Sequence, residues 1–416
     1  MNRREVLVFG AAGVGLAASA AGGTWLRQRS RTEVDLHAHT VAYATEDKRV
    51  LVTDPALLEA DSRVAEGPTT ERPRERMTAF LKAAEPWLDT VPGRYVDLAR
   101  NALLDLWILS DDLPAAVAGW SPPWRYVWPR DASFCAAALA RVGHLDLAVG
   151  QLRYLQQVQL SDGWFEARYV PGTADPPDGR ERQFDGTGLV TWAIADVRRS
   201  ARRYKRDIDD QLQPLLNRSF QALSKATDGG RALPAASPDF WEVPETRTTI
   251  GVAACTLGGL VAGGELLGQP EPGQRLASVI RGSFGANGFQ RYTSHGGPDG
   301  GSAFFDALGV RGLMTSGQLR SVRRALLKPA GGISPGASWK RDGISWTPAT
   351  SLLGLAMARA GDHQGAREIL DWIDDHRTEC GSIPEKVVYD GSPAAEAPLV
   401  WSDANVLLTL DVLARS

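Results

Sequence analysis

Three short segments place aromatic or apolar side chains directly beside charged ones. They span residues 124–131, 239–242 and 383–385. Aromatic rings stack on the apolar faces of sugars, and charged groups beside them can hydrogen-bond sugar hydroxyls. Hydrolysis of a glycosidic bond requires two carboxyl groups, one to give a proton and one to act as a carboxylate, and Glu242 and Glu385 can form this pair. The residues therefore predict a carbohydrate-binding pocket with hydrolytic chemistry.

The first of these segments combines aromatic rings with an adjacent cation and anion. Trp124, Tyr126 and Trp128 stand at a spacing of two, so an extended chain would present the three rings on one side. Arg130 offers a planar fork of hydrogen-bond donors and Asp131 offers acceptors, so this pair can grip two neighbouring sugar hydroxyls. A simpler interpretation of Asp131 is the N-cap of the helix that follows.

The two candidate catalytic glutamates have different neighbours. Glu242 directly follows Phe240 and Trp241. An apolar wall beside a carboxyl group raises its pKa, as a general acid working near neutral pH requires. The alternative is a glutamate that only favours the dipole of the next helix. Glu385 stands in the last long loop before Trp401, where an exposed glutamate is also commonplace.

A further loop carries a high density of aromatic and basic residues. Residues 162–169 contain Trp, Phe, Tyr and Arg, and Asp185 follows in the motif 183–186. This density favours a cleft wall over a plain solvated connection. Asp185 could contact a sugar there, or it could cap the helix that comes next.

Composition excludes several classes of function. The chain has 46 Lys and Arg against 49 Asp and Glu, and it contains no basic block, so a nucleic-acid partner is not expected. The sequence has no P-loop, no HExxH motif and no GxGxxG motif after a strand, so neither a metal nor a cofactor is expected. The three cysteines are far apart, which favours buried thiols over disulfides.

The N-terminus is interpreted as an export segment covering residues 1–30. Arg3 and Arg4 precede an apolar run at 6–26, with small residues at 18–20 for cleavage. The paired arginines look like a twin-arginine signal. The run is also long enough to remain as a membrane anchor. We expect an exported protein that is periplasmic, extracellular or membrane-tethered, and a membrane contact only through this segment.

The rest of the chain divides into a linker or N-terminal extension at 31–75 and a helical domain at 76–416. The extension is polar and has one candidate strand at 49–53. In the domain, apolar residues recur at helical spacing and strand signals are sparse. The helical stretches are 77–88, 95–108, 132–142, 145–158, 189–204, 208–226, 248–267, 273–284, 303–313, 317–327, 348–360, 365–375 and 399–414.

Loop lengths alternate between these helices. The long loops are 109–130, 159–186, 228–247, 328–347 and 378–398, and they hold the candidate site residues. About a dozen helices with long loops on alternate connections predict an all-α (α/α)6 barrel, a ring of six helical hairpins. The long loops would then converge at one end and form a pocket.

The motifs resemble those of glycoside hydrolase family 15, the glucoamylase family, which includes glucodextranases and some trehalases. The matching segments are 124–134, 162–169, 183–186, 239–242 and 384–402. Their order and spacing agree from about residue 95 to the end of the chain. The family has an (α/α)6 barrel, which the helix pattern predicts independently.

The resemblance implies an inverting exo-acting hydrolase that releases glucose from the non-reducing ends of α-glucosides. It implies that Glu242 is the general acid and Glu385 is the general base, with their carboxyl groups about 6.5–9.5 Å apart. An oligosaccharide or polysaccharide is the expected partner, and the oligomeric state stays open. The implied substrate-binding residues are Tyr126, Trp128, Arg130, Asp131, Asp185, Trp241 and Trp401.

Three positions depart from the family pattern. Val243 stands where a second acidic residue is common, Lys386 stands where the base is usually followed by Gln, and the loop 338–346 differs from that of relatives. These changes leave the preferred linkage open. The alternatives are a trehalase-like or isomaltosidase-like hydrolase of the same fold, or a carbohydrate-binding barrel that does not hydrolyse.

Overall fold

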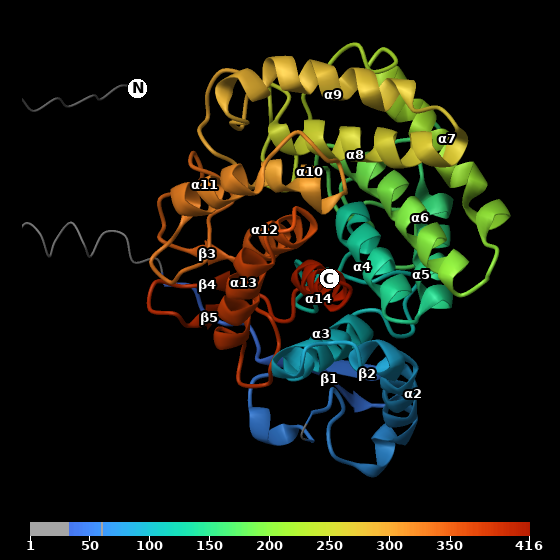
Figure 1. Ribbon diagram of the computed structural model, residues 1–416. Helices are drawn as coiled ribbons and strands as arrows, with labels where there is room; N and C mark the ends of the chain where they lie inside the picture. The colour runs from blue at the N-terminus through green and yellow to red at the C-terminus, as the bar shows by residue number, and fades with distance from the viewer. Residues whose placement is uncertain (1–32, 60) are drawn as a thin grey trace, which may run out of the picture.

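The computed structural model describes residues 33–59 and 61–416. The predicted export segment 1–30 lies outside these residues. In the described part of the chain a β-hairpin is followed by thirteen α-helices, α2 to α14 (Figure 1). Each helical stretch predicted from the sequence corresponds to one of these helices. The stretch 303–313 forms only a short helix, because Gly309 and Gly312 adopt φ of 81° and 79°.

The helices form two concentric rings. Figure 1 shows the inner helices α4, α12 and α14 near the centre, with α7 and α9 at the periphery. The inner ring closes because the last helix packs on the first. It consists of α4 (Pro129–Arg141), α6 (Asp185–Arg203), α8 (Ile250–Leu267), α10 (Phe304–Ala307), α12 (Thr347–Arg359) and α14 (Val400–Ala414).

Six outer helices each precede one inner helix in the chain. They are α3 (Val96–Ile108), α5 (Leu145–Val158), α7 (Asp209–Ala226), α9 (Glu271–Ser283), α11 (Ser316–Leu326) and α13 (His363–Asp375), and α2 (Glu71–Leu88) packs on α3. Outer helices are amphipathic: α13 buries Ala366, Ile369, Leu370 and Ile373, which recur at helical spacing. Six outer–inner hairpins make the fold an (α/α)6 barrel, as predicted.

Small residues bring the inner helices α6 and α8 close together. A Cβ atom on Gly188 would lie 2.1 Å from the backbone oxygen of Cys255, and one on Gly259 would lie 2.8 Å from the Cα of Gly188. Helix α8 is the one helix of the described residues that is long and apolar enough to cross a membrane. Since 78% of it is buried inside the structure, its apolar sequence serves the core.

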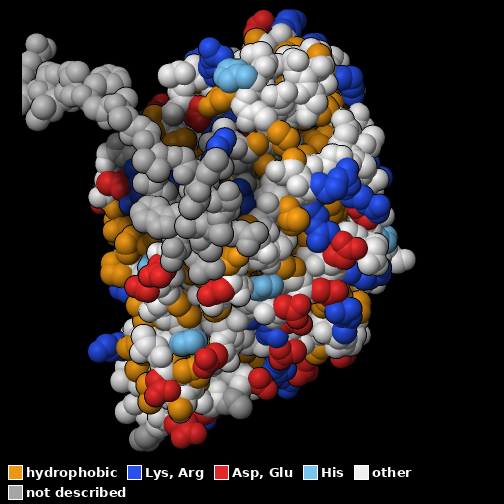
Figure 2. Space-filling view, turned by 90° about the vertical axis from the view of Figure 1, so that its left-hand side faces the viewer, with side chains coloured by type: hydrophobic (Ala, Val, Ile, Leu, Met, Phe, Trp, Pro, Cys, Tyr) orange, Lys and Arg blue, Asp and Glu red, His pale blue; other side chains and the backbone are white. Residues whose placement is uncertain are grey.

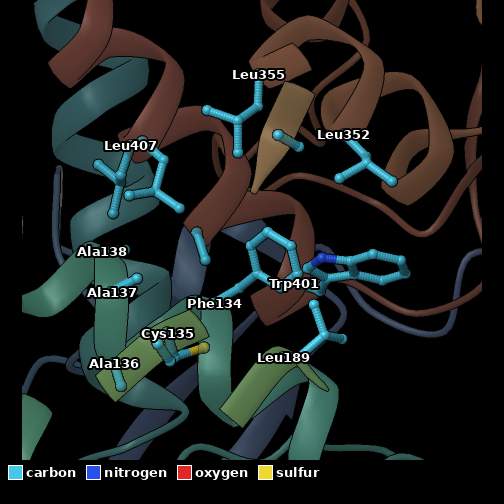
Figure 3. Packing of buried hydrophobic residues seen from close by; sticks show 14 of the residues in the cluster. Phe134, Cys135, Ala136, Ala137, Ala138, Leu189, Leu352, Leu355, Trp401 and Leu407 are labelled. Atoms are coloured by element: carbon cyan, nitrogen blue, oxygen red, sulfur yellow. The ribbon is translucent and has the colours of Figure 1, made fainter. Parts of the chain in front are cut away.

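The hydrophobic core extends to the first turn of α14, where it includes Trp401. Figure 3 shows Phe134 of α4 beside Trp401 of α14, with Leu352 and Leu355 of α12 close by. The rings of Phe134 and Trp401 have centroids 5.8 Å apart, and Phe304 stacks on Trp401 at 6.1 Å. The position of the Trp401 ring is therefore fixed by its packing against Phe134 and Phe304.

The segment before the barrel is folded against it. β1 (Thr40–Thr45) and β2 (Lys48–Val52) form an antiparallel hairpin, and β2 matches the predicted strand to within one residue. Arg63 is almost fully buried, and its Nε donates to Asp105 Oδ1 of α3 over 2.7 Å. The polar composition of residues 31–75 suggested a linker. The segment is nevertheless packed against the barrel, because an ion pair with Asp105 lets the charged Arg63 enter the core.

Three short strands connect distant loops. β3 (Ser345–Trp346), β4 (Lys386–Val387) and β5 (Pro393–Ala394) form an antiparallel sheet in that order. The connections also include single 3-10 turns at Pro55–Leu57, Pro68–Thr70, Gly93–Tyr95, Gly285–Asn287 and Gly300–Ala303. On the face shown in Figure 2, basic and acidic side chains are interspersed with hydrophobic ones.

We expect Arg63→Leu to lower the free energy of unfolding by about 3–5 kcal/mol, because it leaves Asp105 buried without its cation. Urea unfolding followed by circular dichroism measures this. Arg72→Leu is the matched control, since Arg72 pairs with Glu46 at the surface and such pairs contribute about 0–1 kcal/mol. Equal effects of the two substitutions would show that the extension contributes no buried anchor.

Candidate active site

The loops that precede the inner helices meet in one pocket of about 270 Å³. Every lining residue lies in such a loop or in the first turn of an inner helix, so the predicted convergence of the long loops is observed. The lining residues are Ala118, Pro123, Trp124, Trp128, Arg130, Asp131, Arg168, Arg180, Phe240, Trp241, Glu242, Pro335, Trp339, Trp346, Pro348, Ala349, Glu385, Leu399 and Trp401.

Arg130 lies at the centre of the charged groups in the pocket. Its guanidinium is 2.9 Å from Glu242 Oε1, 3.3 Å from Asp185 Oδ2 and 3.5 Å from Asp131 Oδ2. The same group lies over the ring of Trp401, 5.1 Å from its centroid. One buried cation thus joins α4, α6 and the loop before α8.

The two aspartates beside Arg130 are not helix caps. Trp128 is the N-cap of α4 and Phe184 is the N-cap of α6, and both aspartates lie in the first helical turn. Burial raises the pKa of Asp131 to about 6 and that of Asp185 to about 6, although Arg130 opposes the shift. Asp131 lines the pocket. Asp185 contacts Arg130 but does not line the pocket itself.

Glu242 is held by a tight turn and two arginines. It has a φ of 55°, a left-handed value that costs a non-glycine residue energy and is common at functional sites. Oε1 accepts from Arg130, and Oε2 accepts from Arg180 on the loop before α6. The expectation that apolar side chains surround this carboxyl group is therefore wrong, since both of its oxygens contact arginines. The reason is tertiary, because Arg180 comes from a loop that is remote in sequence.

Glu385 is buried directly before β4. Its backbone N–H donates to Glu396 O over 2.7 Å, and its carbonyl accepts from Thr347 N over 3.1 Å. Burial raises the pKa of the carboxyl group, and Lys386 Nζ, 3.2 Å from Oε2, opposes that shift. The alternative of an exposed loop glutamate is wrong, because the short sheet encloses this residue.

Six tryptophans line the pocket. Trp241 lies against the Arg291 guanidinium at 3.5 Å and meets Trp339 edge to face at 4.9 Å. Trp339 in turn meets Trp346 at 5.5 Å, so the loop 338–346 supplies part of the wall. Among the residues that the structure describes, the buried indole N–H groups without an acceptor are those of Trp128, Trp241, Trp339, Trp346 and Trp401, together with Trp192 in the core.

These unpaired donors gather where a polar ligand would bind. Outside the pocket, Trp87 donates to Asp411 and Trp372 donates to Ala330 O. Buried polar groups nearly always have a partner, so a cluster of unpaired ones indicates a site for ordered water or for ligand hydroxyls. In the same pocket the buried oxygens Asp131 Oδ2 and Glu385 Oε2 have only cations as partners, Arg130 at 3.5 Å and Lys386 at 3.2 Å.

The structure brings seven of the nine predicted site residues together in the pocket, while Asp185 and Tyr126 lie outside its lining. Tyr126 is not among the lining residues, and its ring lies under the Arg168 guanidinium at 4.5 Å. The three aromatic rings of this segment do not share one side, because Trp124 is in a turn closed by a bond from its N–H to Ser121 O. The segment is therefore not extended along its whole length.

Several lining residues were not selected from the sequence. Arg168 stands in the aromatic loop 162–169 and Phe240 stands close to Glu242, whereas Trp339 and Trp346 stand in the loop 338–346, which departs from the family pattern. Arg180 had no signal at all, since it lies in a polar stretch rich in Gly, Pro and Asp. Its place beside Glu242 depends on how the loop before α6 folds across the pocket.

A ring of six helical hairpins with an aromatic, acidic pocket at one end defines the class of glucoamylase-like barrels. No family model matches the chain. An uncharacterized glycosyl hydrolase of Methanocaldococcus jannaschii is 28% identical over 174 residues, which are 41% of this chain. The match spans 26% of the length of that relative.

Solved structures share the fold over most of the chain. A glycosidase variant in complex with glucose has a TM-score of 0.63 and 22% identity, covering 76% of this chain and 96% of that one. A glycoside hydrolase family 15 glucoamylase from Hypocrea jecorina has a TM-score of 0.58 and 16% identity, covering 78% and 72%. The chain has the glucoamylase-like fold, so the family resemblance is confirmed at the level of the fold.

We expect Asp185→Asn to gain stability relative to the unmodified protein as pH rises from 4 to 7. The pKa of Asp185 is raised to about 6 in the folded protein, so its ionisation destabilises the fold across this range. The relative gain should be on the order of 2 kcal/mol, by urea unfolding at pH 4, 5.5 and 7. A constant or falling difference would contradict the role of burial at this carboxyl group.

Proposed function

We propose that this protein is an inverting, exo-acting glycoside hydrolase of the glucoamylase type that releases glucose from the non-reducing ends of α-glucosides. One observation carries the proposal: Glu242 and Glu385, which are far apart in the sequence, line the same small pocket. Arg130, Asp131 and six tryptophans line the same pocket. An acid, a base and an aromatic sugar platform are the parts that this reaction needs.

The terminal sugar would be held at the inner end of the pocket. Arg130 donates and Asp131 accepts, so the pair can bind neighbouring hydroxyl groups. The indole N–H groups of Trp128 and Trp401, which lack an acceptor, can donate to further hydroxyls. The rings exclude water from the reacting carbon, which strengthens each polar contact in the pocket.

Glu242 would protonate the glycosidic oxygen as the bond from that oxygen to the anomeric carbon breaks. In the structure both oxygens of this carboxyl group accept hydrogen bonds from arginines, Oε1 from Arg130 and Oε2 from Arg180. Arg180 is 40% exposed on a loop, so an entering substrate can displace it and leave Glu242 against apolar surface. Opening of the Arg180 contact is thus part of the proposed cycle.

Glu385 would act as the base on the opposite face of the sugar. It takes a proton from a water molecule as the water oxygen forms the new bond to the anomeric carbon, so the configuration inverts. Burial raises the pKa of Glu385 and so strengthens it as a base, and the neighbouring Lys386 keeps it ionised. The rate should fall as pH drops through the pKa of this group.

A trehalase-like or isomaltosidase-like activity is the second candidate. It is favoured by the loop 338–346, which places Trp339 and Trp346 in the wall, and by Lys386, whose Nζ lies 4.5 Å from the Trp346 ring centre. By the family resemblance, these groups would stand on the side of the leaving sugar. The small pocket also favours short substrates over long chains.

Glu242→Gln is expected to lower kcat on the best of maltose, isomaltose and trehalose by about 10²–10⁴-fold, because the proton donor is lost. Released glucose is measured enzymatically, and proton NMR of the first product should show β-glucose. Glu181→Gln, an exposed glutamate on the Arg180 loop, is the control and should keep full activity. Full activity of Glu242→Gln would refute the acid assignment, and initial products that contain α-glucose without β-glucose would refute inversion.

Export is proposed from residues 1–30 alone. Lysine in place of both Arg3 and Arg4 should trap the protein inside the cell, because twin-arginine signals are read by their receptor through the paired arginines. Immunoblots of cell fractions measure this. The control replaces Arg27 and Arg29, which follow the apolar run, and should leave export unchanged. Export of both variants alike would exclude a twin-arginine route.

A further inference from the structure

A short segment of the N-terminal extension lies alongside the sheet that carries Glu385. His37 N donates to Ala395 O over 2.8 Å, and Ala395 N donates to Asp35 O over 2.9 Å. Leu36 and Ala395 form a parallel bridge just after β5. Since β5 pairs with β4, which directly follows Glu385, residues 35–37 lie beside the chain that leaves this sheet.

Glu396 links this sheet to the opposite wall of the pocket. Its side chain is fully buried, and Oε1 accepts from Trp120 N over 2.6 Å and from Ser121 N over 2.9 Å. Its backbone oxygen accepts from Glu385 N. The loop that it binds also carries Trp124 of the pocket wall. A Cβ atom on Gly119 would lie 2.4 Å from Glu396 Oε1, so this close approach requires glycine.

His37 completes the surroundings of that buried carboxylate. Its Nδ1 lies 3.2 Å from Glu396 Oε2 and 3.5 Å from Ser121 Oγ. Its ring meets Trp124 edge to face at 5.4 Å. A buried carboxylate is costly unless each oxygen is bonded, and here the two backbone donors serve one oxygen and the histidine serves the other.

We propose that His37 and Glu396 are positioning residues for Glu385 and Trp124, and that His37 is held in place by the backbone pairing of its segment with Ala395. This assignment rests on the hydrolase function proposed above. Glu396 binds the backbone of Glu385 directly. Together with His37, it also holds the loop that carries Trp124 of the pocket wall. The charged groups that face Glu385 are Lys386, Glu396 and His37, from β4, the segment after β5 and the N-terminal segment.

The kinetic test uses His37→Ala, with His37→Asn as the conservative variant and Asp35→Ala as the control on the same segment. Asp35 pairs through its backbone oxygen, so its side chain can be removed without loss of the strand. His37→Ala should lower kcat roughly 10-fold with KM and Tm nearly unchanged, since small displacements of a catalytic group are costly. His37→Asn should recover most of the rate, because its amide N–H can donate to Glu396. Unchanged kcat in His37→Ala would overturn the proposal.

The pH profile separates positioning from simple loss of structure. Glu396→Gln removes an anion near Glu385, lowers the pKa of the base and should move the acid limb of kcat/KM to lower pH. His37 lowers the pKa of Glu385, so His37→Ala should move that limb to higher pH. Opposite shifts support the assignment. The assignment would be overturned if the acid limb of kcat/KM in both variants lay at the same pH as in the unmodified protein.

A readout that does not depend on hydrolysis keeps this test apart from the proposed function. The carbon-13 signal of the Glu385 carboxyl group, assigned with Glu385→Gln, can be titrated in each variant. If the unmodified protein hydrolyses no glucoside, the proposed function fails while this titration still reports on Glu385. Titration curves that move apart in opposite directions support positioning. Identical curves in His37→Ala, Glu396→Gln and Asp35→Ala overturn it.

Discussion

The buried guanidinium of Arg130 is the interaction on which the candidate site depends. It joins Asp131, Asp185 and Glu242 and lies over Trp401, so it connects α4, α6, α14 and the loop before α8. Three carboxyl groups around one cation cannot all be neutralised by it. Burial accordingly raises the pKa of the two aspartates. This imbalance makes the pocket responsive to protons and to ligands that bring further hydrogen-bond donors.

A second buried arginine supports the turn that presents Glu242. Arg291 pairs with Asp239, Asp299 and Glu245 and also lies against Trp241. Asp239 accepts from Thr249 and from Trp241 N, which fixes the residues just before Glu242. Burial raises the pKa of Asp299 to about 7. The two arginine centres fix the turn from opposite sides, which explains how a left-handed glutamate is maintained.

The contribution of the N-terminal segment was the least predictable part of the molecule. Residues 31–75 are polar and lack helical periodicity, and such composition is typical of a linker. In the structure, Arg63 enters the core to meet Asp105, and His37 meets Glu396 behind the pocket wall. The partners lie 42 and 359 residues away in the chain. Nothing local in the sequence marks such pairs, because a charged residue has the same appearance in a linker and in a buried ion pair.

The sequence by itself determined the ring of helices and the loops that carry Trp128, Arg130, Glu242 and Glu385. Helical spacing of apolar residues and punctuation by Gly and Pro are local signals, so they survive without knowledge of the fold. Only the tertiary structure decided that Tyr126 lies outside the pocket lining, that Arg180 binds Glu242 and that Glu385 is buried. Burial and charge pairing arise when segments remote in the chain meet, and the order of residues along the chain does not state which segments will do so.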